Sequence, residues 1–284
     1  MRNQASAAAR KTADTGSKTA APAGIVEPAS DPAKVTKRLT LDTAALRAGG
    51  YLPEESRDRQ FADHYRRVKR PLVDKALSGA STVGEPRVIM VTSALPGDGK
   101  TFTSINLALS MALERDISVL LVDCDVAKQH VSQIMGVKQE RGLLDALIDE
   151  SADIESLVMQ TNMRGLSLLP AGKRVEATAE LLSSNRMRQI ITALCHSNSR
   201  RIVLLDSPPL LITNEGRALV KVAGQVVLVV RAGYTPRHAL QEAVELFDAQ
   251  QAGGLILNHV AGDGNEDYYG YGLYGANGID VDAP

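Results

Sequence analysis

The sequence is poor in cysteine, in net charge and in long apolar runs. Cys124 and Cys195 are its only two cysteines, too few for a disulfide framework or a metal cluster, so both are expected to fill the core of a protein in a reducing cytosol. The formal net charge of −1 provides no basic surface for nucleic acid, which is not expected as a partner. Apolar runs such as 226–230 fall far short of the ~20 residues that span a membrane, and no signal-peptide core is visible. These absences predict a soluble chain.

What is present favours one α/β domain with tails. The 284 residues are 44% hydrophobic and 23% charged, as in ordinary globular proteins. Residues 1–34 lack hydrophobic periodicity and are predicted to be a disordered tail. Residues 35–84 are expected to form a helical and linker segment, 85–260 the main domain, and 261–284 a flexible tail.

The segment before the main domain contains one clear amphipathic pattern. Within 61–76, Phe61, Tyr65, Val68 and Leu72 recur at helical spacing. Pro71 should kink or restart this helix. Basic side chains lie between the apolar ones, and they form either a solvated helix face or a contact with another subunit: Arg66, Arg67, Lys69 and Arg70.

After residue 84, short β-branched runs alternate with longer amphipathic segments, which is typical of βαβ units. Strands are expected near 88–92, 119–122, 166–169, 202–205, 226–230 and 255–257. Helices are expected over 103–113, 143–149, 179–194, 215–222 and 236–249. The predicted fold class is therefore α/β, a mostly parallel sheet with helices on both faces, and ligands should bind beyond the carboxyl ends of the strands.

A phosphate-binding loop follows the first of these strands. Residues 94–101 read Ala-Leu-Pro-Gly-Asp-Gly-Lys-Thr, a P-loop with Ala in place of its first Gly, in the order strand, loop, helix. Lys100 should reach the β- and γ-phosphates of a nucleotide, and the Thr101 hydroxyl should bind Mg²⁺. The expected cofactor-binding residues of this loop are Gly97, Asp98, Gly99, Lys100, Thr101 and Phe102.

Carboxylates follow two further strands. Asp123 and Asp125 end the second strand, and Asp206 follows the fourth, before Ser207-Pro208-Pro209. At the mouth of a parallel sheet beside a P-loop, these side chains can hold Mg²⁺ together with Thr101. A carboxylate beyond those needed for the metal is a candidate base. Lys100, Asp123, Asp125 and Asp206 are therefore the candidate catalytic residues, and an ordinary helix N-cap is the alternative for each carboxylate.

Four of the seven tyrosines lie in the last 17 residues, interleaved with glycine: Tyr268, Tyr269, Tyr271 and Tyr274. A P-loop alone indicates only a nucleotide, and a Gly/Tyr tail alone could be low complexity. Together they favour a protein that phosphorylates its own tail.

These motifs resemble the bacterial tyrosine kinases of polysaccharide export, and within them the autokinases associated with exosortase and exopolysaccharide loci. The resemblance runs from about Leu39 to Tyr274 and rests on 94–101, 123–125 and 206–209, with support from Pro170-Ala171-Gly172, 179–182 and 254–258. It implies ATP and Mg²⁺ as cofactors, Asp123 as the base and Asn258 near the adenine. By its length, the tail could reach the chain's own site or that of a neighbouring subunit, and transfer to a neighbour is expected.

Departures from the family pattern affect the expected partners. The family's E-x-x-R-x-x-R helix, used to assemble rings, stands here as Asp63-x-x-Arg66-x-x-Lys69. In many relatives the kinase is fused to a two-helix membrane protein, whereas no membrane segment is expected in this sequence. The resemblance therefore implies a separate membrane polysaccharide co-polymerase as activator. It also implies a homo-oligomer, with a ring as one form, in the cytoplasm at the inner face of the membrane.

Two other functions fit the same motifs. One is a ParA/MinD-like ATPase switch, but that group has a signature lysine where this chain has Leu95. The other is a nucleotide-binding scaffold of the export machinery that has no catalytic activity.

Overall fold

The computed structural model describes residues 37–51, 58–79 and 83–260, with side chains omitted for 58–61. The predicted disordered tail, and the tail with its four tyrosines, lie outside these residues. All six expected strands are present: β2 (Glu85–Ser93), β3 (Ser118–Asp123), β5 (Leu166–Leu169), β6 (Arg201–Asp206), β7 (Ala223–Arg231) and β8 (Ala252–Asn258). The apolar runs of the five inner strands are buried on both faces of the sheet, as the parallel arrangement requires, whereas β8 at the edge is largely exposed.

Two short strands that the sequence did not indicate extend one edge. β1 (Lys37–Leu39) pairs in parallel with β4 (Met159–Thr161), which runs antiparallel to β5. Three residues are too few to show a period of two, which is why the pattern missed them. The eight-stranded sheet has the order β1-β4-β5-β3-β6-β2-β7-β8.

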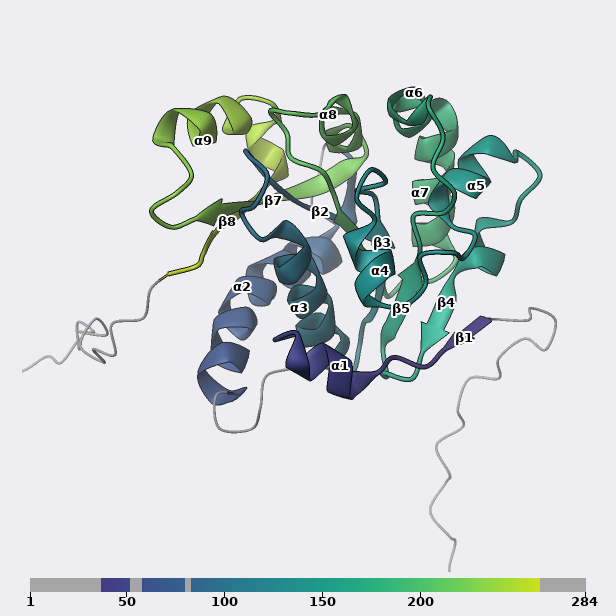
Figure 1. Cartoon of the computed structure of the whole chain (residues 1–284), viewed down its shortest axis with the longest axis horizontal. Coiled ribbons are helices and arrows are strands. Elements are labelled where there is room, and N and C mark those ends of the chain that lie inside the picture. Colours follow the sequence, from purple (N-terminus) through teal and green to yellow (C-terminus); the bar gives the residue numbers. More distant parts are fainter. Residues whose placement is uncertain (1–36, 52–57, 80–82, 261–284) are drawn as a thin grey trace, which may run out of the picture. The chain divides into compact units, whose positions relative to one another are not determined.

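Helices cover both faces of this sheet (Figure 1) and pack on two separate apolar clusters. One face carries α1 (Thr43–Ala48), α2 (Asp58–Ser78), α3 (Lys100–Ala112) and α4 (His130–Ile134). The other carries α5 (Leu143–Ile148), α6 (Thr178–Ser183), α7 (Asn185–His196), α8 (Asn214–Val220) and α9 (Arg237–Val244). Two 3-10 turns, η1 (Ile154–Leu157) and η2 (Ala249–Gln251), precede strands β4 and β8. The predicted α/β class is confirmed, and both cysteines are buried and free.

The prediction of one helix over 179–194 is wrong, because two helices, α6 and α7, occupy this segment. Ser184 leaves the helical region with ψ of 163°, and its Oγ accepts a hydrogen bond from Met187 N at 3.2 Å. Its side chain therefore caps the start of α7, and capping by serine favours a break over a continuous helix.

The restart expected at Pro71 is also wrong, because α2 continues through it from Asp58 to Ser78. Pro71 is exposed while Leu72 and Ala76 are buried. Its missing N–H therefore affects the solvent side of the helix, and the apolar contacts on the other side hold the two halves together.

Lys69 belongs neither to a solvated helix face nor to a contact with another subunit, the two interpretations of the basic run. Its ammonium group is buried, donates to Ser110 O at 2.7 Å near the end of α3, and pairs with Glu114 at 2.7 Å. Arg66 does lie on an exposed face, where it pairs with Asp63 at 2.7 Å. Lys69 therefore joins α2 to α3 within one chain and is not available for a contact with another subunit.

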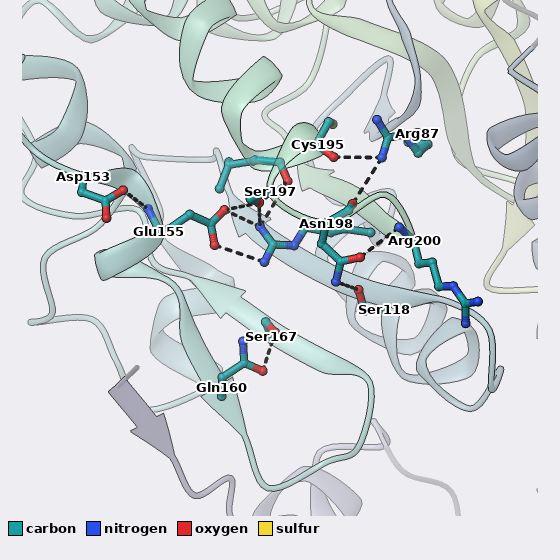
Figure 2. Close-up of polar contacts among 12 residues, drawn as sticks. Arg87, Ser118, Asp153, Glu155, Gln160, Ser167, Cys195, Ser197, Asn198 and Arg200 are labelled. Carbon is teal, nitrogen blue, oxygen red and sulfur yellow. Dashed lines mark hydrogen bonds and ion pairs between the residues drawn. The ribbon is translucent and has the colours of Figure 1, made fainter. Parts of the chain in front are cut away.

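A polar network holds the amino ends of the strands, away from the predicted site. Arg201, which begins β6, is buried and forms two bonds to Glu155, at 2.5 and 3.1 Å. Figure 2 shows this network, in which Arg87 of β2 also donates to Cys195 O at 2.8 Å. These bonds connect β2, β6, η1 and the end of α7, and so fix the strands whose opposite ends carry the predicted site.

Candidate active site

The P-loop has the conformation that its sequence predicts. Residues 94–99 connect β2 to α3, and Gly97 and Gly99 have φ of 90° and 93°, a region that side chains disfavour. A Cβ on Gly99 would lie 2.0 Å from Asn258 Nδ2. Lys100 begins α3 and is buried. The glycines thus let the backbone curl at the amino end of a helix, where N–H groups can face an anion.

Asp98 and Asn258 hold this loop in place. The buried Asp98 carboxylate accepts a hydrogen bond from Thr235 Oγ1 at 2.7 Å, and its backbone oxygen accepts one from Asn258 Nδ2 at 2.9 Å. The Asp98 side chain therefore faces the protein, and only its backbone remains for a phosphate. Asn258, expected near the adenine, lies against the loop backbone. Thr235, which follows β7, was not identified from the sequence.

Asp206 lies directly beneath the start of α3. Its Oδ2 accepts from Thr101 Oγ1 at 2.9 Å, and its Oδ1 accepts from Ser104 Oγ at 2.8 Å. Burial, together with the charge of Asp123, raises the pKa of Asp206 to about 7. Thr101 and Asp206, both predicted as metal ligands, are thus in contact. Ser104 is an additional partner, one helical turn after Lys100.

Asp123 is the register partner of Asp206 in the neighbouring strand. Its Oδ2 accepts from both the backbone N–H and the hydroxyl of Ser132, at 2.8 and 2.7 Å. Its Oδ1 is buried and has no hydrogen-bond partner. Burial raises the pKa of Asp123 to about 6. An unpaired buried carboxylate oxygen is costly and indicates a position reserved for another group.

Asp125 and Lys100 complete the charged group. The backbone oxygen of Asp125 accepts from Gln129 N at 2.7 Å, and its buried carboxylate accepts a longer bond of 3.4 Å from Lys128 N. Asp125 thus shapes the turn before α4, but the N-cap of that helix is Gln129, so the N-cap alternative is wrong for Asp125. Burial lowers the pKa of Lys100, whereas the charges of Asp206 and Asp125 raise it. The four candidate catalytic side chains therefore share one electrostatic environment.

Phe102 lies one residue beyond the P-loop threonine and contacts the amino-terminal segment. Its ring centroid is 5.4 Å from that of Tyr51, at a tilt of 43°. Burial and the charge of Asp206 raise the pKa of Tyr51. Phe102 thus connects the segment after α1 to the start of α3, a contact that no sequence pattern indicated.

The predicted metal ligands do not form a closed metal cage. Among the residues that the structure describes, no group of three or more His, Cys, Asp or Glu side chains is arranged to hold a metal ion. Mg²⁺ bound with a nucleotide takes most of its ligands from phosphate and water. The protein is therefore expected to supply a hydroxyl and one or two carboxylates.

In the part of the chain that the structure describes, no helix has the length and apolarity needed to cross a membrane.

Comparison with known proteins identifies the family. Residues 86–252 match the family described as AAA domain. The chain is 32% identical over 198 residues to tyrosine-protein kinase YwqD of Bacillus subtilis, covering 69% of this chain and 81% of that protein. It is 30% identical to tyrosine-protein kinase wzc of Salmonella typhimurium, covering 70% of this chain but only 28% of that protein.

A solved structure supports the same assignment. The crystal structure of the VpsO kinase domain matches with a TM-score of 0.58 and 27% identity, over 73% of this chain and all of that one. Nucleotide binding follows from membership of this P-loop family. The narrower exosortase association stays a prediction. The chain belongs to the bacterial tyrosine-protein kinases, built on an AAA-type P-loop domain.

Proposed function

We propose that the protein transfers the γ-phosphate of ATP, bound with Mg²⁺, to Tyr268, Tyr269, Tyr271 and Tyr274 of its own tail. The observation that carries this proposal is the pair Asp123 and Asp206, buried side by side under the P-loop with Asp123 Oδ1 unpartnered. An ATPase needs one carboxylate near its metal. A second one with a free oxygen is suited to take a proton from an incoming hydroxyl.

The residues present fit a magnesium ion. Burial and the charge of Asp123 raise the pKa of Asp206, and burial and the charge of Asp125 raise that of Asp123. A divalent cation would relieve the repulsion among these carboxylates. Thr101 and Asp206 would hold the ion, with Asp123 and Asp125 close by. When bound, it would neutralise charge on the phosphates.

The residues of the chain would divide the chemistry among them. Lys100 would contact the β- and γ-phosphates and stabilise the charge on the group in transfer. The tyrosine oxygen would bond to the γ-phosphorus while the bond to ADP breaks, and the phenolic proton would pass to Asp123 Oδ1. A phenol has a pKa near ~10, and a carboxylate whose pKa is raised to about 6 accepts its proton better than an ordinary aspartate.

The biological setting follows from the family resemblance. We assign the kinase to exopolysaccharide polymerisation and export, in the cytoplasm at the inner face of the membrane. Its activator would be a separate membrane co-polymerase, and it would act as a homo-oligomer, with a ring as one form. The chain matches 81% of the length of YwqD but only 28% of the length of the wzc protein.

Incubation with MgATP, followed by mass spectrometry of the tail, tests the proposal. Lys100→Met should abolish phosphotyrosine, whereas Met at the exposed Lys221, just after α8, should not. Phosphotyrosine in the Lys100→Met protein would reject it. ATP hydrolysis without phosphotyrosine would favour the ATPase switch, and binding without turnover would favour the scaffold. Leu95, packed against the core where the switch proteins have lysine, already counts against the switch.

A further inference from the structure

A basic cavity lies beside the active site on the α5 side of the sheet. Its volume is about 350 Å³, and its walls come from residues 138–141, Gln129, Asp145 and 172–174. Three exposed cations lie on its edge, here called the basic rim: Lys138, Lys173 and Arg174. None of the three has an ion pair recorded within the described residues.

The acidic side chains of this cavity are already engaged. Glu140 pairs with Lys37 at 2.9 Å. Asp145 Oδ2 accepts from the backbone N–H groups of Gly142 and Lys173, at 2.8 and 3.2 Å. The cavity therefore presents an excess of positive charge to an incoming ligand, and an acidic one is favoured.

The walls of the cavity are held in a fixed geometry. Gln129 Nε2 donates to Gly172 O at 2.8 Å, and Leu143 N donates to Pro170 O at 2.9 Å. A Cβ on Gly142 would lie 2.0 Å from Pro170 O, so the two loops approach as closely as glycine allows. A preformed cavity binds its ligand at a lower entropic cost than a mobile surface.

Hydrogen bonds connect this wall to the candidate base. Ala171, next to Gly172, donates its N–H to Ser132 Oγ at 3.1 Å, and that hydroxyl donates to Asp123 Oδ2 at 2.7 Å. These bonds fix the position of the cavity wall relative to Asp123.

The tail has a matching sequence. Asp263, Glu266 and Asp267 directly precede Tyr268, and residues 260–284 contain no Lys or Arg. We propose that the basic rim docks this acidic segment from a second copy of the chain and so presents the tyrosines to the active site. This inference rests on the proposed function, because it names how that site selects its substrate.

Distance favours a second copy over the chain's own tail. The cavity lies beyond the end of β5, and four strands separate β5 from β8, where the tail begins. Five strand spacings amount to ~24 Å. Nine residues connect Asn258 to Asp267, and a segment of that length reaches ~30 Å only when it is fully extended. The chain's own tail would therefore have to be stretched along the edge of the sheet, whereas the tail of a neighbouring chain would not.

The test separates enzyme from substrate. The enzyme is the full chain with its four tail tyrosines changed to phenylalanine, and the substrate is the Lys100→Met chain. Lys138→Glu with Lys173→Glu in the enzyme should raise KM for the substrate chain about tenfold, with kcat changed less than twofold. Lys221→Glu with Arg188→Glu, which reverses two exposed charges away from the cavity, should leave KM unchanged.

Charge exchange and direct binding complete the test. Asp263→Lys, Glu266→Lys and Asp267→Lys together in the substrate chain should restore a low KM with the charge-reversed enzyme. A labelled peptide of residues 261–275 should bind the unmodified chain about tenfold more tightly than the charge-reversed chain. This binding measurement does not depend on catalysis. Equal peptide affinity, or an unchanged KM, would overturn the docking site while phosphotyrosine formation still supported the kinase. Peptide binding without any phosphotyrosine would reject the kinase alone.

Discussion

Replacing Asp206 with asparagine should stabilise the nucleotide-free protein at pH 8 while abolishing its activity. Burial, followed by the charge of Asp123, raises the pKa of Asp206 from 3.8 to about 7. The folded protein therefore binds this proton more tightly than the unfolded chain. Stability from this group is fully present near pH 4 and is lost as the pH rises to 7, where the carboxylate becomes charged in the core.

The size of the effect follows from the shift. Three pKa units correspond to about 4 kcal/mol at pH 8. The variant does not gain this whole amount of stability, because its buried Lys100 no longer has the carboxylate that most favours the charged ammonium form. We expect a net gain of about 2 kcal/mol, or roughly 4–8 °C in Tm for a domain of this size.

Thermal unfolding of the parent and Asp206→Asn proteins, without nucleotide at pH 5 and pH 8, measures the difference. It should be small at pH 5 and in favour of the variant at pH 8, and added MgADP should raise the Tm of the parent alone. The control is Asp149→Asn, because a hydrogen bond from Ser151 lowers the pKa of that exposed carboxyl. A variant less stable than the parent at pH 8, or a difference independent of pH, would refute the reasoning.

Three further predictions concern single side chains. Asp123→Asn should keep nucleotide affinity within about threefold but reduce phosphoryl transfer by ~10²-fold or more, measured by titration and single-turnover kinetics; loss of binding instead would make Asp123 mainly a metal ligand. Lys69→Met should cost about 1–3 kcal/mol, because it leaves Ser110 O and Glu114 without their partner, whereas Arg66→Met on the exposed face should cost under ~0.5; equal losses in urea unfolding would contradict the anchor. Arg201→Met should cost about 3–5 kcal/mol because it leaves the largely buried Glu155 without its ion pair, with only the hydrogen bond from Ser197. A urea midpoint equal to that of the parent would show that the ion pair contributes nothing.

Much of this fold could be predicted because most of its longer strands are buried on both faces. Continuous apolar runs such as 202–205 mark their own positions, and the P-loop glycines mark the turn that follows β2. Because parallel strands end at one edge, Asp123 and Asp206 could be expected to lie together, as their register shows.

The remaining features depend on contacts that a linear pattern does not contain. Thr235 is 137 residues from Asp98, its hydrogen-bond partner, and Ser132 reaches Asp123 only through the turn before α4. Lys69 reads as a surface cation because its partners lie at the end of another helix. In each case strand order or helix packing, not local sequence, determines the neighbour.

The bond between Thr101 and Asp206 has a consequence for synthesis of the protein. It joins residues 105 positions apart, and β6, which carries Asp206, pairs with both β2 and β3. While residue 206 is still inside the ribosome, a nascent chain has its phosphate-binding loop but neither Asp206 nor the strand that supports it. Non-local pairing of this kind forms late and slowly. Nucleotide can therefore stabilise the chain only after about three quarters of it has emerged, which leaves the apolar strands β2 and β3 without their shared neighbour and prone to aggregation until then.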